Sequence, residues 1–100
     1  MTALPSIDKD LCVRRLKVLA DQTRLEILRL LMESPKHVGE LNTHLHLEQS
    51  LLSHHLKVLR QEGFVESTRD GKAVLYQLAP PCTTADMKAL DLGCCILSFD

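Results

Sequence analysis

A run of leucines at helical spacing between residues 49 and 61 constrains the fold more than any other feature of the sequence. Leu52, Leu56 and Leu59 recur at steps of three and four residues, so they line one stripe of a helix. The opposite side carries hydrogen-bonding and cationic side chains and no acid: Gln49, Ser50, Ser53, His54, Lys57 and Arg60. A helix with this pattern packs through its leucines and leaves the polar side facing outward.

Helical periodicity also predicts three helices before this segment. Asp21 is a suitable residue to cap the second of them, and Ser34-Pro35 ends it. Gly63 is suited to end the leucine-backed helix in a left-handed conformation. The four predicted helices span residues 7–20, 23–33, 38–45 and 49–61.

A pair of short β-type segments follows the fourth helix. Residues 64–68 and 73–78 flank Asp70-Gly71, and Asp-Gly is a strong hairpin signal. A break at Pro80-Pro81 precedes a last predicted helix over residues 83–97, in which Gly93 weakens the final turn. This order predicts a mainly α fold with a small β-hairpin wing, a winged helix-turn-helix whose wing spans about residues 64–78.

The length and composition agree with one small domain over residues 1–100. Apolar residues make up 45% of the chain but only three residues are aromatic, so the core is expected to be aliphatic. So much apolar surface on a short chain indicates that part of it is buried against a second subunit. The apolar runs are too short to cross a bilayer and no signal peptide opens the chain, so we expect a cytoplasmic protein without a membrane partner.

The polar side of the fourth helix fits the major groove of double-stranded DNA in side-chain chemistry and length. Arg69 and Lys72 at the tip of the predicted hairpin are placed to reach a neighbouring phosphate backbone. The net charge of −1 does not by itself indicate a nucleic-acid partner, so the interpretation rests on this local face. Two alternatives remain open: an ordinary solvated helix surface, and a module that binds protein rather than DNA.

The histidines are expected to play different parts. His55 falls beside the leucine stripe and is expected to pack inward, whereas His54 points outward. His44 and His46 are two residues apart, which places them on different sides of a helix and favours a solvated pair over a metal site.

The sequence lacks the patterns of an enzyme. It contains no G-x-S-x-G, no phosphate-binding glycine loop and no H-E-x-x-H. A chain of this size also has little room for a deep pocket. We therefore expect a protein that is not an enzyme.

Three segments together resemble the ArsR/SmtB (arsenic-repressor) family of bacterial repressors. They are LADQTRLEILRLL, then VGEL, then SLLSHHLKVLRQEGFVESTRDGKAVLYQL, and the similarity covers about residues 11 to 80. The resemblance implies a homodimer formed through the first and last helices, which represses transcription at an imperfect operator palindrome and leaves it when an inducer binds. It implies no cofactor for DNA binding itself.

The sequence departs from the founding arsenic sensors of this family at the third helix. Those proteins carry a C-V-C-D-L-C thiolate cluster, whereas residues 37–42 here read H-V-G-E-L-N. Other family members bind a metal between the antiparallel last helices of two subunits. The position that matches one of their early ligands is Cys82, and the late end of the segment offers Cys94 and Cys95.

The resemblance thus implies a soft-ligand site made by Cys94, Cys95 and the partner subunit's Cys82, suited to As(III), Sb(III) or another thiophilic ion. Cys12, on the first helix of the same interface, is an alternative third ligand. The thiols are also candidates for redox or persulfide sensing, and each cysteine could instead be a small buried hydrophobe. The sequence leaves the identity of the inducer open.

Overall fold

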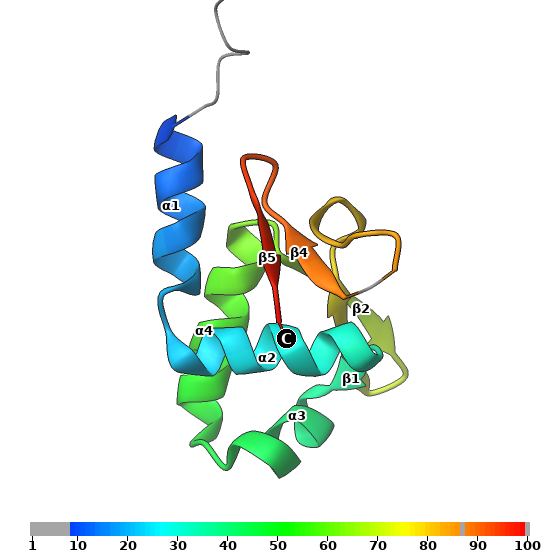
Figure 1. Ribbon diagram of the computed structural model, residues 1–100. Helices are drawn as coiled ribbons and strands as arrows, with labels where there is room; N and C mark the ends of the chain where they lie inside the picture. The colour runs from blue at the N-terminus through cyan, green and yellow to red at the C-terminus, as the bar shows by residue number, and fades with distance from the viewer. Residues whose placement is uncertain (1–8, 87, 100) are drawn as a thin grey trace, which may run out of the picture.

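A computed structural model describes residues 9–86 and 88–99 and shows a helical body that carries two β-hairpins (Figure 1). The helices are α1 (Lys9–Leu19), α2 (Gln22–Glu33), α3 (Val38–Leu45) and α4 (Gln49–Gln61), with a 3-10 turn η1 at Pro80–Cys82. The strands are β1 (Lys36–His37), β2 (Val65–Asp70), β3 (Ala73–Leu78), β4 (Ala89–Asp91) and β5 (Ile96–Ser98). The predicted winged helix-turn-helix is confirmed in its first four helices and its wing; residues 7 and 8 of the first predicted helix lie outside the described part.

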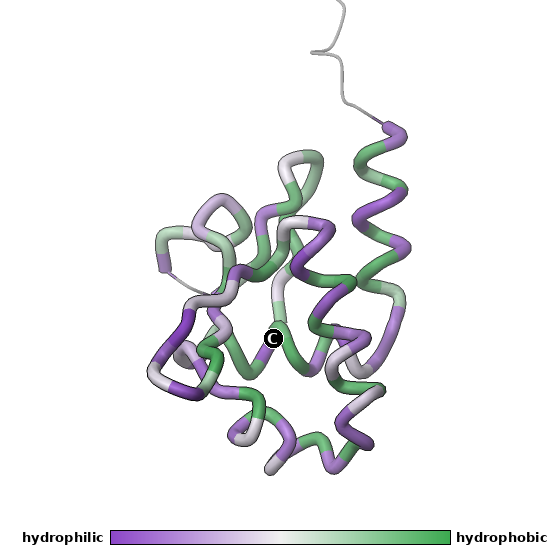
Figure 2. Tube along the Cα trace, turned by 180° about the vertical axis from the view of Figure 1, so that it is seen from behind, coloured by the Kyte–Doolittle hydropathy of each residue, from purple (hydrophilic) through white to green (hydrophobic). Residues whose placement is uncertain are grey.

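The core is aliphatic, as the composition predicts. α2 is its central element, because Ile27, Leu28, Leu30 and Leu31 are all buried against the surrounding helices and strands. Figure 2 shows the hydrophobic stretches of the trace where the helices meet and the hydrophilic ones at the wing tip. No helix in residues 9–86 and 88–99 is long and apolar enough to cross a membrane.

The turn between α3 and α4 is held by one side chain. Asn42 accepts a hydrogen bond from the Leu47 backbone N–H at 2.8 Å and donates one from Nδ2 to the Leu47 carbonyl at 3.0 Å. His46 adopts a left-handed conformation with φ 54° and closes α3 through its N–H to the Asn42 carbonyl. α4 then ends as predicted, with Gly63 at φ 81°. These contacts fix the angle at which α4 leaves α3.

The wing is an antiparallel hairpin of β2 and β3, in register from Val65 opposite Leu78 to Asp70 opposite Ala73. Gly71 has φ 63°, the conformation that the Asp-Gly signal predicts. β1, which the sequence pattern did not indicate, adds a third strand beside β3. This extra strand ties the start of α3 to the wing.

The prediction of a helix over residues 83–97 is wrong. The described part of this segment forms the β4–β5 hairpin, in which Ala89 lies opposite Ser98 and Asp91 opposite Ile96; Met87 lies outside the described residues. Two aspartate side chains accept hydrogen bonds from backbone N–H groups that a helix would pair with carbonyls. Asp86 accepts from the Lys88 N–H, and Asp91 accepts from the Gly93 N–H. Gly93 itself has φ 86°, which a right-handed helix excludes.

Candidate nucleic-acid interface and thiol site

α4 separates its two sides as the leucine spacing predicts. Leu52, Leu56 and Leu59 are buried in the core. All six polar residues predicted for the outer side are exposed: Gln49, Ser50, Ser53, His54, Lys57 and Arg60. The helix contains no acidic residue, so its outer side can approach a polyanion without local repulsion.

The buried side of α4 is anchored by a polar contact. His55 is 7% exposed, as predicted for a packed histidine, and its Nδ1 accepts a hydrogen bond from Nε of Arg24 at 3.1 Å. Arg24 also donates to the Val18 carbonyl at the end of α1. Its own N–H donates to Asp21, which caps α2 and whose pKa this bond lowers. The Arg24 side chain therefore links α2, on which it lies, to α1 and α4.

The wing tip carries the two predicted cations, Arg69 and Lys72, both exposed. Beside them His37 contacts Asp70 of β2 through Nε2 at 2.8 Å and Glu40 of α3 through Nδ1 at 2.9 Å. The Glu40 and Asp70 carboxylates raise the pKa of His37. This contact joins the wing to the helix-turn-helix, and the sequence did not single it out because its partners are 33 residues apart.

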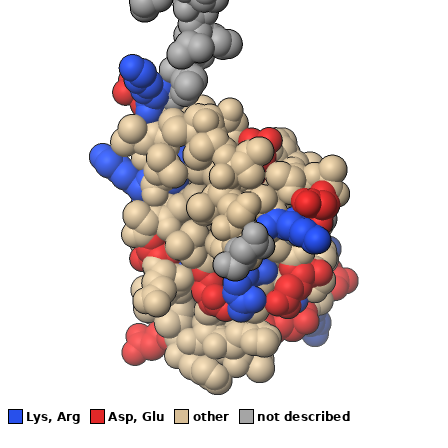
Figure 3. Space-filling model, viewed as in Figure 1, with Lys and Arg blue, Asp and Glu red and all other residues tan. Residues whose placement is uncertain are grey.

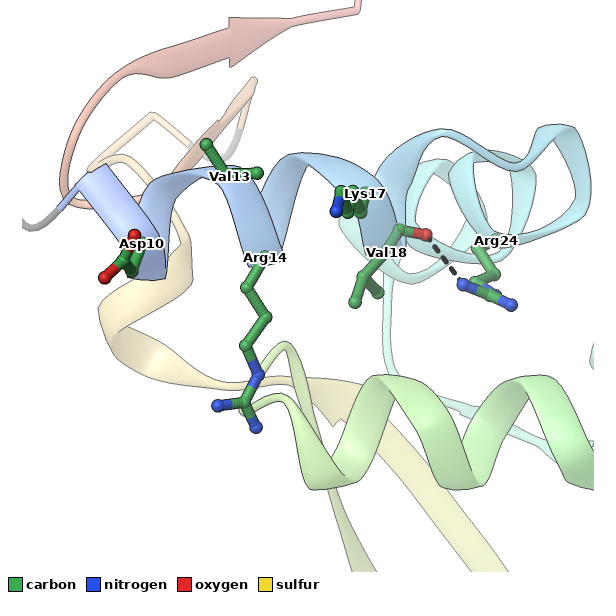
Figure 4. A pocket seen from close by; sticks show the side chains of 6 residues that line it. All are labelled: Asp10, Val13, Arg14, Lys17, Val18 and Arg24. Atoms are coloured by element: carbon green, nitrogen blue, oxygen red, sulfur yellow. Dashed lines mark hydrogen bonds between the residues drawn. The ribbon is translucent and has the colours of Figure 1, made fainter.

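An open groove of about 500 Å³ runs along α1 and reaches Arg24 of α2 (Figure 4). Two of its lining cations, Arg14 and Arg24, are engaged in the fold, while Lys17 is exposed. Arg14 points toward α4 and pairs with Glu62 at its end, and Arg24 donates to the Val18 carbonyl. These contacts indicate a structural junction rather than a catalytic pocket.

Three of the four cysteines meet where the tip of the β4–β5 hairpin reaches α1. Cys12 of α1 and Cys94 of the hairpin form a disulfide across a sequence separation of 82 residues. The Cys95 sulfur lies 3.9 Å from that of Cys94, and all three sulfurs lie within 4.8 Å of one another. Within the described residues this is the one group of three or more His, Cys, Asp or Glu side chains that could share an ion.

Cys82 is separate from this cluster. It is 3% exposed in η1, and its thiol donates to the Gly63 carbonyl at 3.1 Å, just after the end of α4. Burial raises the pKa of the Cys82 thiol, which disfavours the thiolate that a metal needs. The predicted meeting of Cys82 with Cys94 and Cys95 assumed a pair of antiparallel last helices, and the described segment contains a hairpin instead. The alternative, Cys12, is the cysteine that the fold places beside Cys94 and Cys95.

Arg15 is a further residue of this junction that the sequence pattern did not indicate. It lies one helical turn after Cys12, and its Nη1 donates to the Leu92 carbonyl at 2.7 Å, in the β4–β5 hairpin. Its guanidinium also lies 5.9 Å from the centre of the Phe64 ring. α1 and the hairpin are thus joined by a polar contact as well as by the disulfide.

The charges are unevenly distributed over the surface. Figure 3 shows acidic and basic side chains mixed over the lower part of one face, while charged side chains are sparser over the upper part, where they lie mainly along α1. Large apolar side chains are exposed on α1 and on β5: Val13 is 49% exposed, Leu16 44% and Ile96 63%.

Comparison with known sequences identifies the class of protein. Residues 21–67 match the family described as bacterial regulatory protein, arsR family. The chain is 31% identical over 102 residues to a probable mercury resistance operon repressor of Streptomyces lividans, covering 92% of this chain and 81% of that protein. It is 42% identical over 64 residues to the transcriptional activator HlyU of Vibrio cholerae, covering 64% of this chain and 59% of that relative. The chain thus spans about three fifths of the length of several curated relatives that it matches, such as HlyU.

Solved structures agree with the sequence comparison. A structure of HlyU from Vibrio cholerae aligns with TM-score 0.71 and 34% identity, covering 84% of this chain and 87% of that one. The homodimeric winged helix-turn-helix DNA-binding domain Mb0332 of Mycobacterium bovis aligns with TM-score 0.66 and 32% identity, covering 78% and 76%. Fold, sequence and motif order lead to one conclusion: the chain belongs to the arsR family of bacterial regulatory proteins.

Proposed function

We propose that the protein is a homodimeric transcriptional repressor that binds operator DNA through α4 and the wing and releases it when its cysteines react with an inducer. One observation carries the proposal: an acid-free helix is backed by buried leucines and exposes Ser53, His54, Lys57 and Arg60 together. Such side chains serve both base and phosphate contacts in a major groove. Gln49 and Ser50 extend the same face, and Arg69 and Lys72 of the wing add phosphate contacts.

The dimer is proposed to form through α1. Val13 and Leu16 are exposed on α1, and a second copy of the chain would cover them. The Mycobacterium bovis domain of the same fold is described as homodimeric. Two copies would place two α4 helices against successive major grooves of a palindromic site. The described β4–β5 hairpin, rather than a last helix, would then flank α1 at the interface.

The inducer is proposed to act on the cysteines at the junction of α1 and the hairpin. A thiophilic ion such as As(III) or Sb(III), bound by Cys94 and Cys95 with a third sulfur, is the first candidate. The Cys12–Cys94 disulfide favours a second candidate, in which the inducer is an oxidant that joins Cys12 to Cys94 and alters the arrangement of the two subunits. In both cases a chemical signal acts on α1 and is transmitted to the spacing of the two α4 helices.

The DNA-binding proposal is tested by the salt dependence of binding. Fluorescence anisotropy with the reduced protein and duplexes from its own upstream region should give an affinity that falls by roughly 10³-fold between 50 and 200 mM salt if six or more phosphates are contacted. Lys57→Ala should weaken binding to every sequence. It should also reduce the slope of log affinity against log salt concentration by about 1.

Ser53→Ala and His54→Ala should instead change which duplexes are preferred, since their side chains are placed to meet base edges. Lys88→Ala, which removes an exposed lysine from the C-terminal segment, is the matched control and should bind as the unaltered protein does. If Lys57→Ala and Lys88→Ala behave alike, the outer side of α4 is not the DNA-binding face.

A further inference from the structure

We infer that Cys12, Cys94 and Cys95 of a single chain form one site with two mutually exclusive occupied states. In one state Cys12 and Cys94 share a disulfide. In the other, all three thiolates bind one trivalent soft metalloid ion, the class that includes arsenite and antimonite. The effect on operator binding rests on the proposed function; the site itself does not.

The geometry places the three sulfurs within reach of a common ion. Two sulfurs that each lie about 2.3 Å from one ion are at most roughly 4.6 Å apart. The three sulfurs already lie within 4.8 Å of one another, and Cys95 lies 3.9 Å from Cys94. The difference is small, and once the Cys12–Cys94 bond is reduced the freed side chains and the exposed Cys95 can rotate to close it.

The chemistry makes the two states exclusive. Arsenite, As(OH)₃, exchanges its three hydroxyls for three thiols and releases three waters, so each sulfur must enter as a thiol or thiolate. The disulfide leaves only the Cys95 thiol of this cluster free. A dithiol reductant must first donate two electrons and two protons to the Cys12–Cys94 bond, and the reductant itself becomes a disulfide.

Both states create the same mechanical link. Cys12 and Arg15 lie on one face of α1, and Arg15 already donates to the Leu92 carbonyl at the base of the hairpin turn. A disulfide or a bound ion adds a second, covalent tie from α1 to that turn. In the reduced protein without a bound ion, this covalent tie is absent and the Arg15 hydrogen bond remains between α1 and the hairpin. Oxidation and metalloid binding are therefore two inputs to one switch on the proposed dimerisation helix.

Arsenite titration of the reduced chain tests the site directly. We expect one arsenite per chain, a sulfur-to-arsenic absorption band in the ultraviolet, and loss of three reactive thiols. The oxidised protein should bind none until a dithiol is added. Cys12→Ser, Cys94→Ser and Cys95→Ser should each weaken binding on the order of 100-fold or more, whereas Cys82→Ser, the matched control, should bind normally. Binding that survives Cys12→Ser, or that is lost in Cys82→Ser, would overturn the assignment.

A mixing experiment separates a site within one chain from a site shared between two. Dimers assembled from a Cys12→Ser chain and a chain carrying both Cys94→Ser and Cys95→Ser contain all three cysteines, but never in one chain. A single-chain site predicts that no arsenite binds, and one ion per mixed dimer would overturn it. Operator binding by the reduced, empty protein is measured separately by anisotropy. If the protein binds arsenite but not operator DNA, the proposed repressor function is wrong and the proposed three-cysteine site is still supported.

Discussion

His55 is a buried polar residue of α4 that anchors this helix to Arg24 of α2. It is buried, and its Nδ1 accepts from Arg24, so the ring must be neutral at that nitrogen. Burial lowers the pKa of His55 from its ordinary value of 6.5, and the positive charge of Arg24 acts in the same direction. The neighbouring His54 is exposed and free to meet a ligand.

This difference predicts a pH dependence of stability. Because the folded pKa of His55 is lowered, the unfolded chain binds more protons, and the stability from neutral His55 is full above about pH 6.5 and is lost as the pH falls below it. Denaturant melts between pH 7.5 and 5.5 should show this loss against the opposite contribution of His37, whose raised pKa adds stability over the same range. His55→Asn keeps an acceptor near Arg24 without titrating and should flatten the profile. His44→Gln, which alters an exposed histidine, should keep the slope of the unaltered protein, and an equal flattening there would exclude His55 as the source.

Residues on α4 could be assigned from sequence because a helix repeats every 3.6 positions, so burial of Leu52 and Leu56 fixes which side chains face out. The thiol cluster could not be assigned in this way. Cys12 and Cys94 meet only because a hairpin brings residue 94 back to α1, and that closure depends on contacts across the whole chain. The sequence supplied both candidates for the third sulfur, Cys12 and Cys82, and only the fold separates them.

At the scale of elements, the helix-turn-helix depends on the short connection between α3 and α4. Asn42 makes two hydrogen bonds to Leu47 and so satisfies the N–H and the carbonyl of a turn residue that lies outside both helices. Asn42→Ala should therefore cost about 1–3 kcal/mol in the free energy of unfolding, measured by urea denaturation.

Asn42→Ala should also weaken operator binding, since α4 would no longer leave α3 at a fixed angle. Thr43→Ala is the matched control, because the Thr43 hydroxyl bonds only the Gly39 carbonyl within the same helix. Its loss should change stability by less than about 0.5 kcal/mol. Equal effects of the two substitutions would mean that the turn is not held by Asn42.

The segment after Pro80-Pro81 shows the limit of periodicity at this scale. Leu90 and Leu92 are buried and suggested a helix, but two leucines on a short segment fit a strand equally well. The Asp91 side chain and the positive φ of Gly93 decide the outcome by forming a turn. The wing was predictable because Asp-Gly stands between two clear strands, whereas Asp-Leu-Gly in a cysteine-rich segment carries a weaker turn signal.

At the scale of the whole molecule, the arrangement separates two surfaces by their chemistry. α4 and the wing expose cations and hydroxyls, while α1 and the hairpin expose large apolar side chains, among them Val13, Leu16 and Ile96. A monomer would leave Val13 and Leu16 in water, and a second copy would remove them from it. The thiol cluster lies on α1 and the hairpin, so a change there is expected to act on the proposed dimer rather than directly on the proposed DNA-binding face.

The dimer proposal predicts that a charge on α1 separates the subunits. Leu16→Glu, which places a carboxylate in the middle of a buried interface without a partner, should halve the mass measured by analytical ultracentrifugation at micromolar concentration. Leu51→Glu is a matched control, because Leu51 is also 44% exposed but lies on α4. It should remain dimeric, although its added charge should weaken DNA binding. Leu16→Glu should keep its helical circular dichroism and yet lose most operator affinity, since one α4 helix alone contacts half of the site. If Leu16→Glu stays dimeric, α1 is not the contact between subunits, and the cysteine cluster must act on DNA binding by a route within one chain.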